Sequence, residues 1–368
     1  MSHVKVLCLA LVVILALSCS AFGAKGPGAR SYVTGNYHLT LDGAKCGFLK
    51  SVDGGGVTAE VVSEPAGKSY FAKKHIGQPK YEEFEIQVGF SMTKVLYNWI
   101  QQSWSMNYQR MNGSLVALDY QLNPVSERQF NQALITETTI PAVDGSSKEP
   151  AYIALKFAPE YTRTVKPSGS RAEYGQFGKN EQKVWLPSSF KLEIEGLDCS
   201  KVSKIDSFTV KQTVAKDDIG EARDQKKEPG KLEFPNLKIT LADSTAQSWL
   251  AWHEDFVIKG NNDDKREKSG VLSFLSPNRQ DVLAQIKFYN MGIIRAQPEK
   301  AEANADTIRR IQVELYVERM EFVPGKSVLA SGSTETPGSE AASTPATTAP
   351  ASKQTPAPSA SKTLRRAG

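Results

Sequence analysis

The sequence predicts a mainly β chain made of two tandem copies of one domain, each a β-barrel or β-sandwich with one short α-helix. The first observation is an internal repeat: Tyr37–Ile100 aligns without a gap with Phe190–His253, 153 positions further along. The second is the alternation of apolar and polar residues in short runs, which is typical of half-buried strands. The third is one stretch of helical spacing in each copy, suited to covering an open end or face of the strands.

The repeat is supported by residues whose roles are hard to exchange. Matched glycines indicate matched backbone turns, and a matched tryptophan indicates a matched large core position. We therefore expect the two halves to share the same backbone turns and the same core positions, in one register. The identical pairs include Leu39 and Leu192, Gly43 and Gly196, Cys46 and Cys199, Val57 and Val210, Gly77 and Gly230, Ile86 and Ile239, and Trp99 and Trp252.

Length and charge set the class of protein. The 368 residues are enough for two domains that each bury a core. The formal net charge is only +5, and basic residues are interspersed with acidic ones. This pattern is typical of a solvated surface and argues against a nucleic-acid groove, so no nucleic-acid partner is expected.

Residues 1–23 have the features of a signal peptide. A basic residue precedes the apolar run Val6–Leu17, and Ala21–Gly23 resembles a cleavage site between small residues. The run is too short for a stable transmembrane helix, and no later run is long enough to be one. We therefore expect Sec-type export to the periplasm or the extracellular space, with cleavage after Gly23. The alternative is lipid anchoring at Cys19.

The first copy begins after a leader at residues 24–36 and occupies residues 37–162. Its opening strand ends in the turn Asp42-Gly43, and an exposed polar hairpin is expected around Ser63–Lys74. A helix is predicted over Ser91–Ile100, with Ser91 as its cap and Trp99 in the core. The predicted strands are Tyr37–Leu41, Val57–Val61, Phe84–Val88, Leu115–Leu122, Phe130–Ile140 and Tyr152–Tyr161.

A linker at residues 163–188 leads to the second copy at residues 189–324. The same order returns: a strand and turn, a charged hairpin Ala215–Lys227, another strand, and a helix over Ala246–His253. The spacing then grows from 153 to 158 at Ile135 and Ile293, and to 160 at Leu155 and Leu315. The predicted strands are Phe190–Ile194, Phe208–Val214, Leu237–Leu241 and Ile311–Val317. Residues 325–368 are rich in Ser, Thr, Pro and Ala, and we expect a disordered tail.

No residue is assigned a catalytic, cofactor-binding or metal-binding role. The glycines Gly54–Gly56 lack the Lys and Ser or Thr of a phosphate loop, and the scattered Ser, His and Asp have no nucleophile–base spacing. Cys46 and Cys199 are the two cysteines left after cleavage, and in an oxidising compartment such a pair suggests a disulfide. They occupy equivalent positions of the two copies, however, and side-by-side copies hold equivalent positions apart, which favours two free thiols over the disulfide. We expect two small buried thiols and no enzyme.

Four motifs recur in the same order in both halves. An opening strand ends in a one-glycine turn at Leu39–Gly43, and a later strand leads into a long polar hairpin. A Pro-Gly-x-x-Lys-Tyr-like element then precedes a strand, as Ile76–Tyr81 and as Pro229–Phe234. A helix with a Trp near its end follows, at Leu96–Ile100 and at Trp249–His253. In this order the motifs resemble the T-even-type phage tail tube protein family, which is related to the haemolysin-coregulated tube protein of type VI secretion.

The resemblance implies a structural protein that self-associates into a ring or filament. Family members usually have one domain and no Sec signal, although two-domain tube proteins that form trimeric, pseudo-hexameric rings exist. We expect the hairpins Val57–Lys74 and Val210–Lys227 to join neighbours through strand edges. The alternative is a monomeric secreted or envelope-associated binding module that reuses the same barrel.

Overall fold

The computed structural model describes residues 35–65, 67, 71–90, 92–167, 171, 185–217, 226–299 and 308–325. All of them fall within one compact unit, Met1–Ser333. The predicted signal peptide and nearly all of the predicted leader and tail lie outside the described residues. None of the helices in the described part of the chain has the length and apolar character needed to cross a membrane.

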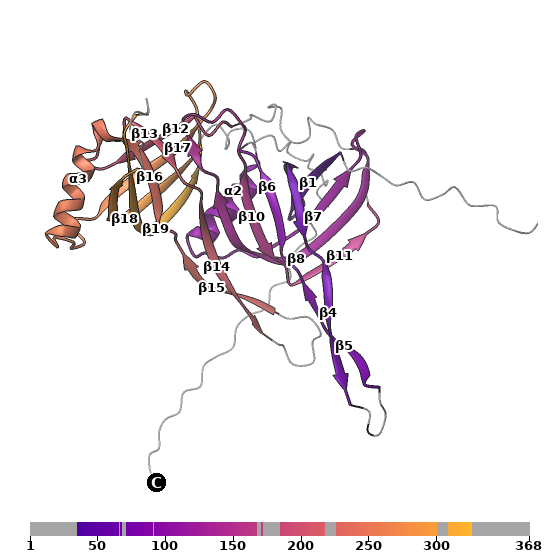
Figure 1. Cartoon of the computed structure of the whole chain (residues 1–368). Coiled ribbons are helices and arrows are strands. Elements are labelled where there is room, and N and C mark those ends of the chain that lie inside the picture. Colours follow the sequence, from indigo (N-terminus) through magenta and orange to yellow (C-terminus); the bar gives the residue numbers. More distant parts are fainter. Residues whose placement is uncertain are drawn as a thin grey trace, which may run out of the picture. The chain divides into compact units, whose positions relative to one another are not determined.

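The first half of the chain, residues 36–165, holds strands β1 to β11 and helix α2 (Figure 1). Alternate residues face the core, so that Phe84, Ile86 and Val88 of β6 are buried and the residues between them are not. The elements are β1 (Asn36–Leu41), β2 (Ala44–Leu49), β3 (Ser51–Gly54), β4 (Val57–Glu64), β5 (Lys73–Tyr81), β6 (Phe84–Val88), α2 (Lys94–Trp104), β7 (Met111–Leu118), β8 (Pro124–Ile140), β9 (Val143–Asp144), β10 (Ile153–Ala158) and β11 (Tyr161–Val165).

The second half, residues 190–324, repeats much of this order and ends in one long strand, β19, where the first half has the two short strands β10 and β11. A π-helical turn extends its α-helix, and a 3-10 turn precedes it. The elements are β12 (Phe190–Ile194), β13 (Val202–Ile205), β14 (Phe208–Asp217), β15 (Lys226–Glu233), β16 (Leu237–Ala242), η2 (Asp243–Thr245), α3 (Gln247–His253), η3 (Glu254–Ile258), β17 (Lys268–Leu275), β18 (Val282–Pro298) and β19 (Arg310–Pro324).

Two large antiparallel sheets carry the fold. The first has the order β2-β1-β7-β8-β10-β6-β3, with β11 and β14 also paired to β8 and β15 paired to β14. The second has the order β12-β17-β18-β19-β16-β13-β9. The end strands of each order do not pair with each other, so both sheets are open. The prediction of a mainly β fold with one α-helix in each half is confirmed, with open sheets in place of closed barrels.

Strands β8 and β18 share their irregularities. Gln132 and Asn290, 158 positions apart, both have φ of 52°. Each strand also shifts register with its neighbour at the same place, just after Ile135 in β8 and just after Ile293 in β18. The ladders place Phe157 opposite Ile135 and Leu315 opposite Ile293. Leu315 therefore corresponds to Phe157, and the predicted equivalence of Leu155 and Leu315 is wrong. The sequence pattern did not reveal this error, because a shift of two residues leaves the alternation of a strand unchanged.

The two α-helices hold their tryptophans in the same way. Trp99 and Trp252 are buried, and their indole N–H groups donate to the backbone carbonyls of Gln109 and Arg266, at 2.9 and 3.3 Å. The predicted start of the first helix was too early. Helix α2 begins at Lys94, after an extended Thr93 that makes no side-chain cap bond.

One hydrophobic cluster runs through both halves. It includes Phe84 and Trp99 of the first half together with Phe274 and Phe322 of the second. Trp185, which falls in the predicted linker, is 2% exposed and belongs to the same cluster. Most of that linker, residues 168–170 and 172–184, is outside the described residues, so the predicted domain boundaries stay a prediction.

Candidate functional site

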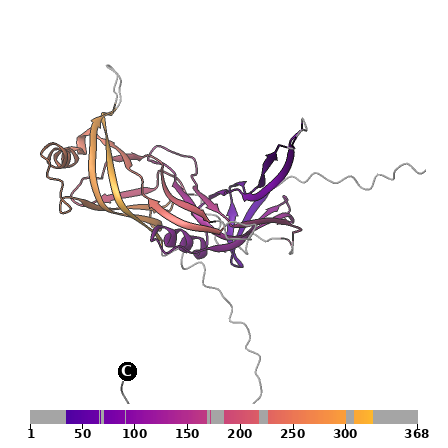
Figure 2. The same ribbon diagram turned by 90° about the horizontal axis from the view of Figure 1, so that it is seen from below.

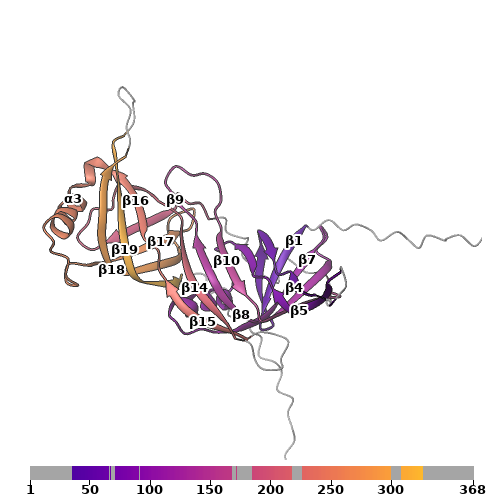
Figure 3. The same ribbon diagram turned by 60° about the horizontal axis from the view of Figure 1, so that its bottom comes forward.

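The two halves are joined by continuous strand pairing, and we call the whole contact between them the seam. Strand β14 of the second half pairs with the end of β8 of the first, with Phe208 opposite Ile140 and Lys211 opposite Glu137 (Figure 3). The hydroxyls of Thr139 and Thr209 are 2.8 Å apart across this pair. Strand β9 of the first half likewise extends the second sheet through β13. Backbone hydrogen bonds therefore link the halves at two places.

Helix α2 supplies the apolar part of the seam. One face of the helix packs on its own half, and its other face lies against β19 of the second half (Figure 2). Tyr97 stacks on Phe322 with ring centroids 5.8 Å apart, and Trp104 meets the same ring edge-on at 5.7 Å. Both α2 side chains are at most 2% exposed. Burial of three large rings at one point makes this a strong apolar contact.

A second aromatic contact closes the seam near β6. Phe90, Trp185 and Phe274 form a triangle of rings with centroid distances from 4.8 to 5.3 Å. The Trp185 indole N–H donates to the backbone carbonyl of Ser189 at 3.2 Å. The ring of Trp185 thus contacts one aromatic residue from each half, and these two residues also contact each other.

Arg110 is the centre of the polar part of the seam. Its guanidinium donates to the backbone carbonyl of Lys227 at 2.6 Å and to the Glu228 carboxylate at 2.9 Å. Glu160 lies 3.9 Å from the same guanidinium and accepts the backbone N–H of Lys227 at 2.9 Å. The pKa of Glu228 is lowered, first by its hydrogen bond from Lys226 and then by the charge of Arg110. The first half therefore binds β15 through charge-assisted hydrogen bonds.

A buried side-chain pair sits beside the β8–β14 ladder. The hydroxyl of Ser103 on α2 donates to the side-chain carbonyl of Gln212 on β14 at 3.0 Å, and both residues are about 5% exposed. This bond fixes the helix to the hairpin of the other half.

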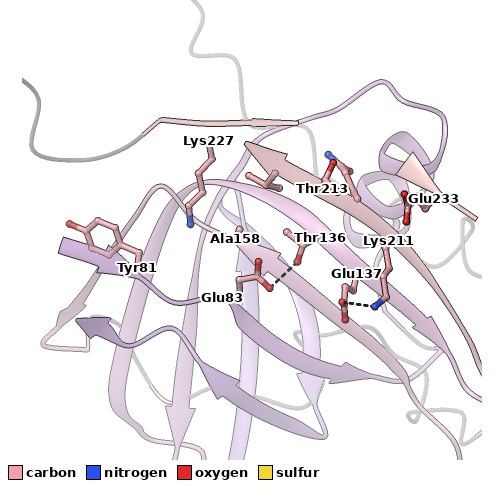
Figure 4. A pocket seen from close by; sticks show the side chains of 11 residues that line it. Tyr81, Glu83, Thr136, Glu137, Ala158, Lys211, Thr213, Lys227 and Glu233 are labelled. Atoms are coloured by element: carbon pink, nitrogen blue, oxygen red, sulfur yellow. Dashed lines mark hydrogen bonds and ion pairs between the residues drawn. The ribbon is translucent and has the colours of Figure 1, made fainter. Parts of the chain in front are cut away.

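A small cleft of about 300 Å³ opens along the seam (Figure 4). Its walls mix both signs of charge: Lys211 is 3.5 Å from Glu137, and Thr136 donates to Glu83 at 3.2 Å. The Lys227 side chain points toward the same space (Figure 4). The first of these contacts joins the two halves and the second lies within the first half, so the cleft is part of the seam.

The hairpin β4–β5, which we call the arm, contrasts with the hairpin β14–β15. The arm's two strands pair only with each other among the described strands, and they project away from the rest of the first half (Figure 1). Its apolar side chains are in water: Val57 is 55% exposed, Val61 59% and Ile76 71%. Val210, the counterpart of Val57, is 2% exposed because β14 lies on β8. The same hairpin is thus covered in one half and uncovered in the other.

Both later cysteines are free thiols in the structure. Burial raises the pKa of Cys46 to about 11, and burial also raises the pKa of Cys199. Neither is therefore an activated nucleophile, because the thiolate is the reactive form. Within the described ranges there is no group of three or more His, Cys, Asp or Glu side chains placed to hold a metal ion.

Sequence reasoning identified both hairpins as the candidate contact sites, and the structure places them differently. The second hairpin contacts the first half of the same chain, and the first hairpin is exposed. Sequence reasoning missed Arg110, Tyr97 and Trp104 as seam residues. A usable signal was present, since the counterparts of Tyr97 and Trp104 in the second helix are the smaller Leu250 and Val257.

Comparison with known proteins gives one match to a family model. Residues 33–163 match the model of the T4-like virus tail tube protein gp19, which confirms the resemblance over the first half. No curated protein sequence matches the chain.

Several solved structures are similar over about a third of the chain. The baseplate of the anti-feeding prophage contains a chain that is 13% identical, with 37% of this chain and 91% of that chain covered and a TM-score of 0.30. The sheath/tube terminator of an extracellular contractile injection system is 16% identical, with 39% and 99% covered and a TM-score of 0.31. Hcp1 from Flavobacterium johnsoniae is 11% identical, with 36% and 93% covered and a TM-score of 0.22. TM-scores at this level carry no inference about function.

Proposed function

We propose that the chain is a non-enzymatic structural protein that assembles into rings or a tube through two tail-tube-like domains, at residues 37–162 and 189–324. The two domains arose by tandem duplication, which accounts for the repeat of 153 residues and for the shared irregularities of β8 and β18. The chain is exported through the signal peptide at residues 1–23.

One observation carries this proposal: the arm is an uncovered copy of a hairpin that the chain already uses as a contact. In the second half that hairpin is bound by strand pairing to the first half. In the first half it exposes Val57, Val61 and Ile76, together with the outer edges of two strands that no other described strand pairs with. Such an edge is a template for pairing with a strand of another chain, and this pairing is the contact through which the proposed assembly forms.

The contact between the halves is also of a type that can be repeated from one chain to the next. It joins two different surfaces, and contacts of this kind form closed rings or open filaments when they are repeated. The match of residues 33–163 to a tail tube family supports the ring or tube. With two domains per chain, three chains make a ring of six domain positions.

The test is the size of the assembled chain. A protein that begins at residue 24 is examined by light scattering after size exclusion and by negative-stain microscopy. Particles with a central hole and the mass of several chains support the proposal. A compact particle of one chain at every concentration would overturn it.

A monomeric binding module is the second candidate, and one groove favours it. A cleft of about 550 Å³ lies beside β12, whose outer edge pairs with no described strand. Lys191, Glu193, Cys199 and Arg279 line it. Its volume is in the range of small-molecule sites. The same size-exclusion experiment separates the candidates, because this function needs no assembly.

A further inference from the structure

The second half has an open strand edge where the first half has a covered one. In β8, one edge pairs with β7 and then, from Glu137 to Ile140, with β14. In β18, the corresponding edge pairs with β17 only as far as Met291. Beyond Met291, no described strand pairs with this edge of β18 at Arg295–Gln297. These residues correspond to Glu137–Thr139 of β8.

The second helix also has an uncovered apolar face at the corresponding place. The seam buries Tyr97 and Trp104 of α2 against β19. Their counterparts 153 positions later, Leu250 and Val257, are 38% and 44% exposed. The opposite side of the same helix is normal core, since Trp249 is fully buried. An apolar residue is thus kept on the outer side at both positions where the seam uses one.

The charges fit a partner with a basic hairpin. Glu267 occupies the position of Arg110, directly before the next strand, and Glu318 occupies that of Glu160. Glu318 is exposed, and Glu267 is partly exposed. The arm carries Lys74 and His75 where β15 carries Lys227 and Glu228. At the positions of the seam pair Arg110–Glu228, the outer side of the second half therefore has an acidic residue and the arm has His75, directly after Lys74.

We infer that this surface, which we call the outer face (Leu250, Val257, Glu267, Arg295–Gln297 and Glu318), binds the arm of a second copy of the chain. The inference rests on the proposed function and adds the partner surface and its register. Strand β4 of one copy pairs antiparallel with the open edge of β18 in the other, as β14 pairs with β8. Val57 then lies opposite Ala296, as Val210 lies opposite Thr138. Each chain thus contacts one neighbouring chain through its arm and another neighbouring chain through its outer face.

The register is tested with a cysteine pair. The chain from residue 24 carries Cys199→Ser, so that only the buried native Cys46 remains, and receives Val57→Cys and Ala296→Cys. Residues directly opposite in an antiparallel pair have Cβ atoms about 4.5–5.5 Å apart, close to disulfide reach. Mild oxidation is expected to link chains covalently. The control pair is Val62→Cys with Ala296→Cys, which keeps an exposed arm residue but lies five positions out of register.

The outcomes separate this inference from the proposed function. Linked chains with the Val57→Cys pair alone support the register. Assembled particles without linkage, or equal linkage with both pairs, would overturn the inference and leave the proposed function standing. Monomers before oxidation at every concentration would overturn both.

A mixing experiment tests the direction of the contact without a disulfide. Val57→Asp disables the arm, and Leu250→Asp with Val257→Asp disables the outer face. All three side chains are at least 38% exposed, so each variant is expected to fold, which circular dichroism checks. Each variant alone is expected to be monomeric, and their mixture to give a dimer and nothing larger. A mixture that stays monomeric, or a variant that keeps the wild-type mass, would contradict the inference.

Discussion

Arg110 shows at the scale of one residue how the seam is held. It lies in the first half, yet its hydrogen-bond acceptors are on β15 of the second half. Its side chain is 26% exposed, so its ion pairs are only partly screened by water. Lys211 also crosses the seam, to Glu137 at 3.5 Å, but its side chain is 59% exposed.

We predict that Arg110→Met lowers the free energy of unfolding by about 1–3 kcal/mol, because the variant removes the charge-assisted bonds to the Lys227 carbonyl and the Glu228 carboxylate. Urea denaturation of the two proteins measures the difference. Lys211→Met is the matched control, and its effect should stay below about 1 kcal/mol because exposed ion pairs contribute little. Equal effects of the two substitutions would show that Arg110 has no special place in the seam.

The buried thiol of Cys46 makes the stability of the fold depend on pH. Burial favours the neutral thiol of Cys46 and raises its pKa to about 11. Its contribution to stability is therefore present below the ordinary thiol pKa and is lost as the pH rises toward about 11.

At pH 8 we predict that iodoacetamide modifies the half-buried Cys199 well before Cys46, measured by mass spectrometry of peptides. In denaturant both should react alike, and faster reaction of Cys46 in the native chain would contradict its placement.

At the scale of elements, the sequence was most informative where one face of a strand is buried. Strand β6 and the segment Ile311–Val317 of β19 alternate cleanly, and both segments were predicted. Strand β2 was missed, because four successive residues from Cys46 to Leu49 are buried and no alternation remains. Trp185 was predicted to lie in a linker because the residues around it have no periodicity, and only the folded chain brings it into contact with Phe90 and Phe274.

The matched valines test the two hairpins as elements. We predict that Val210→Asp lowers the free energy of unfolding by several kcal/mol, because it puts a charge on a residue that is 2% exposed. Val57→Asp should change it by less than about 0.5 kcal/mol, because the residue is 55% exposed, and should abolish assembly. Thermal unfolding and size exclusion report the two effects. An assembled Val57→Asp protein would show that the arm is not the joining element.

At the scale of the whole molecule, the repeat could be found from the sequence but the seam could not. Equal turns and equal core positions predict equal local structure, and Trp99 and Trp252 have the same hydrogen-bonding arrangement. Which strand edge joins which depends on pairings between residues about 70 positions apart, such as Thr138 with Val210. Nothing in a strand's alternation names its partner, because backbone hydrogen bonds are the same for every sequence.

We predict that native assemblies contain three chains, each beginning near residue 24. Native mass spectrometry gives the number of chains, and the mass of the denatured chain gives the N-terminus. The expectation follows from six domain positions filled two at a time. Four or two chains in a closed particle would refute the six-position ring, and a retained residue 1 would refute export through the cleaved signal peptide.

The pairing of β8 with β14 has a consequence for how assembly depends on concentration. This contact forms inside one molecule, so dilution does not weaken it, whereas contacts between molecules dissociate as the protein is diluted. In a three-chain ring, half of the six domain contacts are then permanent, and only three must be formed by collision. Covalent linkage of the two domains thus supplies a high effective concentration for every second contact. Rings of this protein should therefore persist at lower concentrations than rings of six separate domains with the same contacts.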